Sequence, residues 1–164
     1  MSEIEKWTLL LQLAATLTMV GVIWFVQIVH YPLFSQVGRE EFRRYEMDHQ
    51  RLTSWVVGPP MLAELLTAIL LLWWKPAGIP SIALWTGLAL LLSVWVVTYT
   101  VQVPLHASLI LSYDGAIQRR LVRGNWYRTF AWSARGLLVL WMVGQLVTLT
   151  SSSPAGDLAK ATMP

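Results

Sequence analysis

Residues 26–64, VQIVHYPLFSQVGREEFRRYEMDHQRLTSWVVGPPMLAE, decide how this chain of 164 residues is built. The stretch begins at the end of a long apolar segment and continues through a charged connection. Apolar sequence resumes around Gly58-Pro59-Pro60. It contains His30 and His49, two of the three histidines, and Glu64, an acid inside an apolar run. We therefore expect this stretch to contribute most of any chemical centre.

The composition indicates an integral membrane protein. Only 13% of the residues are charged and the mean hydropathy is +0.53, whereas soluble domains carry about 25% charged residues. The absence of cysteine excludes disulfides, thiolate metal sites and cysteine nucleophiles. No glycine-rich phosphate loop is present, and the arginines are too dispersed among apolar segments to indicate nucleic acid as a partner.

Four apolar segments are long enough to cross a bilayer core of about 30 Å. We expect these spans at residues 7–31, 52–74, 80–103 and 129–150. The second and third spans are joined by a tight turn, whereas the connections at 33–51 and 105–128 are longer. Residues 151–164 form a short polar tail. The predicted fold class is an all-α integral membrane protein, a bundle of four transmembrane helices in a single domain, residues 1–164.

The first long connection is expected to contain an amphipathic helix. Phe42, Tyr45, His49 and Leu52 recur at the spacing of one helical face, and charged residues fill the other faces. We expect this helix to lie at the membrane surface and to run into the second span.

The distribution of lysine and arginine predicts the orientation. The two long connections hold eight arginines, whereas the opposite side holds three lysines, Lys6, Lys75 and Lys160. Positively charged connections stay in the cytoplasm. We therefore expect these connections to be cytoplasmic and both termini to lie outside, with the lipid bilayer of a bacterial inner membrane around the spans.

Similar motifs in the two halves predict a parallel two-plus-two repeat. Val26-Gln27-Ile28 recurs as Val101-Gln102-Val103, and each copy has a histidine and a proline close behind it. His49-x-Arg51-x-x-x-Trp55 matches Trp126-x-Arg128-x-x-x-Trp132. Since each half crosses inward and then outward, the repeat axis would run along the membrane normal. Chance similarity between apolar helices is the alternative.

Polar residues near the cytoplasmic ends of the spans mark the candidate site. An acid in the middle of a span costs several kcal/mol unless it faces the bundle interior or water. Glu64 is therefore either a neutral, hydrogen-bonded acid or a ligand, proton or ion-pair group, with Arg135 as its natural partner. The candidate catalytic residues are Glu64, His49 and Arg135, and the candidate cofactor-binding residues are Gln27, Arg51, Gln102 and Arg128.

The histidines are also candidate metal ligands. Three imidazoles and a carboxylate could bind iron, copper or zinc, which gives His30, His49 and His106 as the candidate set. They come from three separate segments, and hydrogen bonding to backbone or lipid headgroups is the alternative. Haem between His30 and His106 is a further candidate, so the sequence leaves the cofactor open between a metal ion, haem and none.

His30-Tyr31-Pro32, Gly58-Pro59-Pro60 and Glu64 together resemble small bacterial four-span membrane proteins whose nearest named relatives are the anthrone-oxygenase-like proteins. The resemblance lies in size, span number and polar residues at one membrane face, and no catalytic motif is matched residue by residue. It implies oxidation of a lipophilic molecule, quinone-like or polycyclic aromatic, taken from the bilayer.

Three functions therefore stay open. The first is a membrane-embedded oxidoreductase or oxygenase-like protein in which His or Glu accepts a proton and Arg holds an oxyanion. The second is a non-catalytic accessory or assembly subunit that packs against other membrane subunits, for example of a respiratory complex, with a homo-oligomer as a related arrangement. The third is a small proton-coupled transporter that uses Glu64.

Overall fold

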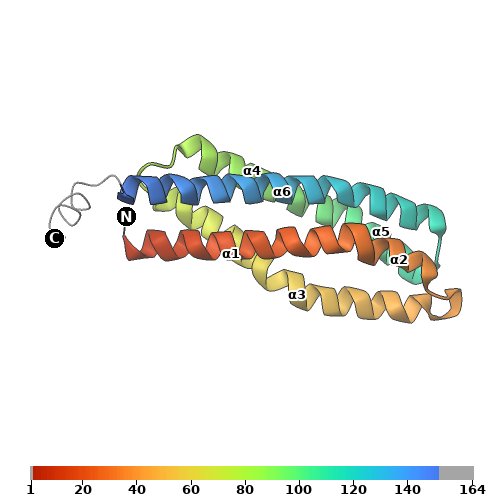
Figure 1. The fold of residues 1–164 in the computed structure, drawn as a ribbon. Coiled ribbons are helices and arrows are strands. Elements are labelled where there is room, and N and C mark those ends of the chain that lie inside the picture. Colours follow the sequence, from red (N-terminus) through yellow and green to blue (C-terminus); the bar gives the residue numbers. More distant parts are fainter. Residues whose placement is uncertain (1, 152–164) are drawn as a thin grey trace, which may run out of the picture.

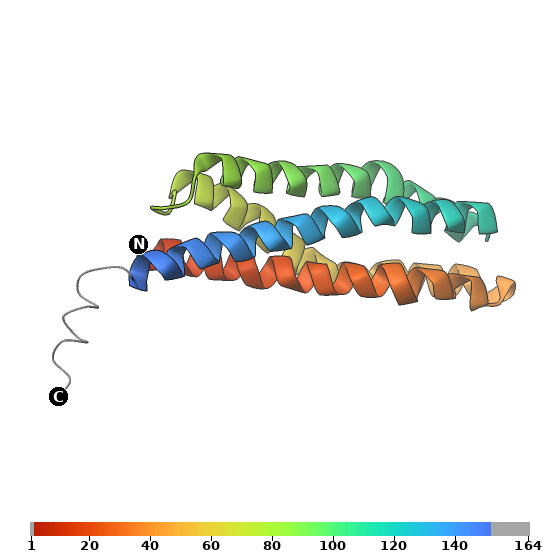
Figure 2. The same cartoon turned by 45° about the horizontal axis from the view of Figure 1, so that its top comes forward.

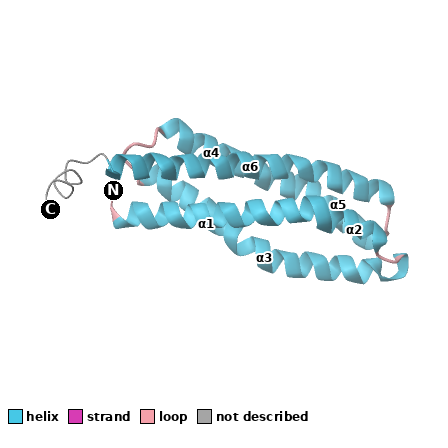
Figure 3. Cartoon of the chain, viewed as in Figure 1, coloured by secondary structure: helices cyan, strands magenta, loops and turns pink. Residues whose placement is uncertain are grey.

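The computed structural model describes residues 2–151, with side chains described as far as residue 148, and this part of the chain is helical with short connections (Figure 3). Four helical segments are long and apolar enough to cross a membrane, as predicted: Glu3–Gln36, Arg39–Trp73, Ser81–Leu111 and Gly115–Thr148. The predicted polar tail lies, beyond Ser151, outside the described residues.

Two of the four segments are interrupted helices and two are continuous. The first comprises α1 (Glu3–Phe25), the π turn η1 (Val26–His30), α2 (Tyr31–Leu33) and the 3₁₀ turn η2 (Phe34–Gln36), and the second is α3 (Arg39–Trp73). The third comprises α4 (Ser81–Val97), the π turn η3 (Thr98–Gln102) and α5 (Val103–Leu111), and the fourth is α6 (Gly115–Ser151).

The prediction of two long connections is wrong, because most of 33–51 and 105–128 is helical. Only residues 37–38 and 112–114 separate the helices at that end. A segment of 34 residues rises about 51 Å, which exceeds a bilayer core of about 30 Å. The helices therefore continue beyond the apolar spans, and most of the charged residues in these extensions are exposed, whereas Glu46 and Arg128 are buried.

The amphipathic helix predicted in the first connection is the beginning of α3 and not a separate element. Phe42 and His49 are buried, whereas Leu52, expected on the same face, is 57% exposed. The predicted face therefore turns toward the neighbouring helices over its first two turns, and α3 runs on into the second span without a break.

Prolines explain both π turns. In η1 the N–H of Tyr31 bonds to the carbonyl of Val26, five residues back, and η3 contains the same bond. Pro32 and Pro104 follow these turns after one intervening residue, Tyr31 and Val103 respectively. A proline has no N–H and collides with the carbonyl four residues earlier. The halves thus share a helix, a π turn and a proline before a long helix, which fits the predicted repeat but leaves it a prediction.

Each of the four long helices packs against two neighbours. Helix α1 packs against α3 and α6, and α4 packs against the same two helices, so α3 and α6 face each other across the bundle (Figures 1 and 2). Helix α3 bends near its middle, where Pro59 and Pro60 lie inside the helix (Figure 1). The beginning of α1 and the end of α6 lie at the same end of the bundle (Figure 1).

The contact between α1 and α6 gives the first prediction. A Cβ atom at Gly136 would lie 3.0 Å from Val20, whereas a Cβ at Gly144 on the same helix would meet nothing within 4 Å. Overpacking a close helix contact costs about 1–3 kcal/mol. We expect Gly136→Leu to lower the free energy of unfolding by that amount in detergent titrations, and Gly144→Leu to leave it unchanged or raise it. Equal stabilities would contradict this packing.

Candidate functional site

The buried polar residues form two clusters at different heights in the bundle. We call the first the central network; it consists of Gln12, Thr16, Glu64, Thr67, Trp132 and Arg135. We call the second the histidine pocket; it is a cavity of about 140 Å³ whose lining includes Tyr31, His49, Gln102, His106 and Arg128. The two clusters have different properties.

Glu64 and Arg135 form the buried ion pair of the central network, which confirms Arg135 as the partner of Glu64. Arg135 Nε donates to Glu64 Oε1 at 3.0 Å. The Thr16 hydroxyl donates to the same oxygen at 2.8 Å, and Trp132 Nε1 donates to Glu64 Oε2 at 3.0 Å. Arg135 also donates to the carbonyl of Gly87. Because these residues come from α1, α3, α4 and α6, the network connects all four spans.

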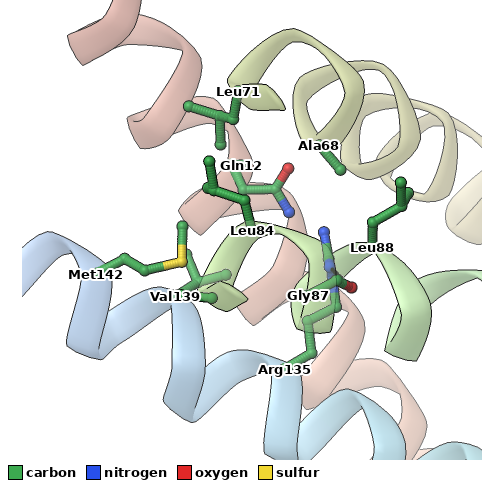
Figure 4. A pocket seen from close by; sticks show the side chains of 10 residues that line it. Gln12, Ala68, Leu71, Leu84, Gly87, Leu88, Arg135, Val139 and Met142 are labelled. Carbon is green, nitrogen blue, oxygen red and sulfur yellow. Dashed lines mark hydrogen bonds between the residues drawn. The ribbon is translucent and has the colours of Figure 1, made fainter. Parts of the chain in front are cut away.

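A small cavity adjoins this ion pair. Gln12 from α1 and Arg135 from α6 point toward one another in it, among apolar side chains (Figure 4). Its volume is about 20 Å³, and a cavity needs roughly 10–15 Å³ to hold one water molecule. Glu64 is already bonded on both carboxylate oxygens. The central network is therefore a hydrogen-bonded core with room for a water molecule and not for an organic substrate.

Tyr31, His106 and Glu46 form a bonded triad at the histidine pocket. His106 Nδ1 lies 2.5 Å from Glu46 Oε1, and His106 Nε2 lies 2.8 Å from the Tyr31 hydroxyl. A carboxylate only accepts hydrogen bonds, so Nδ1 carries the hydrogen and Nε2 of the neutral ring accepts from Tyr31. Gln50 donates to the same oxygen of Glu46 at 3.1 Å. In this triad the carboxylate of Glu46 orients the imidazole of His106, and the imidazole bonds to the phenol group of Tyr31.

Glu46 and Tyr31 were not among the site residues predicted from the sequence. Glu46 stands four residues after Phe42 and three before His49, which places it on the buried face of α3, and its side chain is fully buried. Its spacing from Phe42 and His49 is thus the sequence feature that indicates a buried position. Neighbouring acids of α3, such as Glu41, lie on other faces and are exposed. Tyr31 directly follows the π turn η1 and is buried as well.

His30 and His49 form a second bonded pair, with His30 Nε2 at 2.8 Å from His49 Nδ1. The Thr53 hydroxyl lies 3.1 Å from the same Nδ1 atom. A threonine hydroxyl can donate or accept, and the roles at both contacts depend on the ring tautomers. We assign the Thr53 hydroxyl as the donor, which leaves Nδ1 of His49 without a hydrogen and makes it the acceptor for Nε2 of His30. The neutral His49 ring then carries its hydrogen on Nε2, on a residue that lines the histidine pocket.

Gln102 and Arg128 line the pocket, and each also has buried polar atoms without a partner among the described residues. Both side-chain polar atoms of Gln102, and Nε of Arg128, are buried without a hydrogen-bond partner among the described residues. Leaving such a group unsatisfied costs about 1–3 kcal/mol. Arg128 is held by Asn125 at 3.0 Å, and Asn125 in turn donates to Gln27 at 2.9 Å. The Arg128 side chain is therefore held in place at the pocket wall.

The structure brings some of the predicted site residues together and leaves others apart. His49, Gln102, His106 and Arg128 line one pocket, and Gln27 supports it through Asn125. Glu64 lies 15 residues beyond His49 on α3, which is about 20 Å along a helix, so the predicted catalytic residues belong to two clusters. Arg51 is exposed and bonds to Asp48 at 2.9 Å.

Trp132 links the two clusters, because its indole N–H bonds to Glu64 while the guanidinium of Arg128 lies 5.2 Å from its ring centre. The side chain is fully buried. Such a cation–aromatic contact is worth more when it is shielded from water.

The metal and haem hypotheses stay predictions. The ring centres of His49 and His106 are 5.3 Å apart, and those of His30 and His49 are 4.6 Å apart. Within the described part of the chain, however, no group of three or more His, Cys, Asp or Glu side chains is arranged to hold a metal ion. In the present arrangement Nε2 of His30, Nδ1 of His49 and both ring nitrogens of His106 bond to other side chains.

No protein-family model, curated protein or solved structure matches this chain. The resemblance to anthrone-oxygenase-like proteins therefore stays a prediction, and the site has to be interpreted from its own geometry.

The central network gives the second prediction. Removing one partner of a buried ion pair costs about 3–5 kcal/mol, so Glu64→Leu and Arg135→Leu should each lower the free energy of unfolding by this amount. The double substitution should be less destabilising than the sum of the two, because no charge stays buried and unpaired. A double-mutant cycle in detergent unfolding measures this coupling.

The exposed pair Glu3–Lys6 provides the matched control, with 3.3 Å between its charged atoms. Leucine at either position should change stability little. Additive effects of Glu64→Leu and Arg135→Leu would show that the two residues are not coupled.

Proposed function

We propose that this chain is a membrane-embedded, oxygenase-like oxidoreductase that acts on a lipophilic aromatic molecule in the histidine pocket. The observation that carries the proposal is the composition of the pocket lining. Tyr31, backed by His106 and Glu46, lines the same cavity as the polar side chains of Gln102 and Arg128. A route for a proton and a set of oxyanion donors thus share one site.

The cavity volume supports a substrate that inserts one ring. A cavity of roughly 150 Å³ accommodates benzene, and the histidine pocket has about 140 Å³. Exposed Ser54 of α3 and Val103 of α5 also line it, which places its mouth between these two helices. We propose that an oxygen-bearing ring enters the pocket while the rest of the molecule extends through this mouth into the bilayer.

The residues would divide the chemistry in the following way. The Tyr31 oxygen accepts a proton from the substrate as Tyr31 passes its own proton to His106 Nε2, and Glu46 stabilises the resulting imidazolium. Arg128, Gln102 and the Nε2 hydrogen of His49 donate to the substrate oxygen on which negative charge develops.

Dioxygen is the oxidant in this proposal, and the substrate is an aromatic ring ketone. Loss of a proton from a ring CH₂ conjugated with the carbonyl gives an enolate, which reacts with dioxygen. The overall reaction converts this CH₂ group and O₂ into a second carbonyl group and H₂O. The four electrons that reduce O₂ come from the CH₂ carbon and its two C–H bonds.

Anthrone oxidation in proteoliposomes gives the third prediction. The wild-type chain should speed the appearance of anthraquinone above the rate with empty vesicles. Tyr31→Phe and Arg128→Met should each lower kcat/KM about 100-fold, a typical loss for a proton-transfer or oxyanion group. Arg51→Met removes an exposed arginine and should leave the rate unchanged.

A wild-type rate equal to that of empty vesicles, with a second membrane protein that co-purifies in fixed ratio, would instead support the accessory-subunit function. Proton-coupled flux of a solute, without oxidation of a ring compound, would support the transporter.

The location and orientation are also proposals. The apolar character of the four segments supports a multi-pass protein of the bacterial inner membrane, and the arginines support cytoplasmic placement of the end that carries the histidine pocket. The chain has no cysteine, so a single introduced cysteine reports sidedness.

The fourth prediction concerns labelling of intact cells with a membrane-impermeant maleimide. Lys6→Cys should react in intact cells, and Ser112→Cys should react only after permeabilisation. The reverse pattern would contradict the orientation while leaving the site proposal intact.

A further inference from the structure

A second cavity lies on the other side of α3 from the histidine pocket. It is a groove of about 410 Å³ between α1 and α3, within the range of about 300–1,000 Å³ that is common for small-molecule sites. Its lining is apolar except for His30 and Thr53. Thr53 and Val57 line both cavities, so the groove and the pocket are neighbours separated by α3.

Two sequence features open this groove. Gly21 of α1 lines it and contributes no side chain, and a Cβ atom built there would meet nothing within 4 Å. The bend of α3 at Pro59-Pro60 follows directly after the groove residues Val56 and Val57. The groove residues belong to the apolar part of the two spans, apart from its polar end at His30. Its shape and chemistry fit a hydrocarbon chain with one polar group.

His30 is held in a fixed orientation at the polar end. Its ring stacks on Phe25 with 6.3 Å between centres and an interplanar angle of 21°, and it meets the edge of Phe34 at 5.3 Å. Its Nε2 atom bonds to His49. This bond leaves Nδ1 as the ring nitrogen available to a molecule in the groove.

The bonding of His49 decides which kind of group Nδ1 of His30 can bind. With the Thr53 hydroxyl assigned as donor to His49 Nδ1, Nε2 of His30 carries a hydrogen and donates to the same atom. A neutral imidazole with hydrogen on Nε2 has a lone pair on Nδ1. His30 therefore accepts a hydrogen bond in the groove, which selects a hydroxyl group over a ketone or an ether.

We propose that the groove is a second ligand site, which binds a lipophilic alcohol or phenol with a hydrocarbon chain whose hydroxyl group donates to Nδ1 of His30. The site is separate from the histidine pocket and does not depend on the reaction proposed there. It is linked to that pocket by the His30–His49 hydrogen bond and by Thr53 and Val57, which line both cavities.

Binding of two matched probes tests this site in the full-length chain in phosphatidylcholine nanodiscs. 4-Decylphenol carries the hydroxyl donor, and 4-decylanisole has the same chain with a methyl ether instead. A hydrogen bond worth about 1 kcal/mol corresponds to a factor of about 5 in Kd. Titration calorimetry should show the phenol binding about 5-fold more tightly than the anisole to the wild type, and no such difference for His30→Phe.

Gly21→Phe fills the groove and should weaken both probes at least 10-fold, whereas Gly144→Phe, at another open helical position, should bind like the wild type. Circular dichroism and thermal unfolding show whether each variant is folded. Equal affinity for the two probes in the wild type, or unchanged binding in folded Gly21→Phe, would overturn the proposal and indicate ordinary lipid contact. Loss of phenol binding in Arg128→Met but not in Gly21→Phe would place the probe in the histidine pocket, which overturns the groove site and leaves the proposed function standing.

Discussion

The Glu64–Arg135 ion pair is the interaction on which the rest of the bundle depends. It joins α3 and α6, which face each other across the bundle, and its partners Thr16 and Gly87 belong to α1 and α4. Hydrocarbon offers no partner to a charged or polar group, so these side chains must satisfy one another inside the bundle. One charged pair thereby fixes the relative positions of all four spans.

The histidine pocket lies next to this network, at one end of the apolar spans. Apolar layers lie on both sides of the histidine pocket, and Trp132 connects the pocket to the ion pair. The π turns before Pro32 and Pro104 lead into the backbone that carries Tyr31 and His106, which meet across the bundle. The polar site can thus be rigid, because buried hydrogen bonds such as Tyr31–His106, His106–Glu46 and Arg135–Glu64 join different helices.

The sequence was sufficient to predict the number of spans, the pairing of Glu64 with Arg135 and the gathering of histidines at one end, because apolar length and the cost of buried charge act locally. It was not sufficient for Glu46. That acid lies in a strongly charged segment of α3, and its partner His106 is 60 residues away in the sequence. The two meet where the helices extend beyond the apolar segments, and apolar length alone does not indicate that extension.

The most direct measurement of the central claim is the protonation pattern of the His106 ring, observed by ¹⁵N NMR of the full-length chain with labelled histidine. The signal is assigned by its loss in His106→Gln. The structure predicts hydrogen on Nδ1, facing Glu46, and a hydrogen-bonded but unprotonated Nε2 whose resonance shifts when Tyr31 is replaced by phenylalanine. Hydrogen on Nε2, or an Nε2 resonance that does not respond to Tyr31→Phe, would contradict the triad and with it the proposed route for the proton.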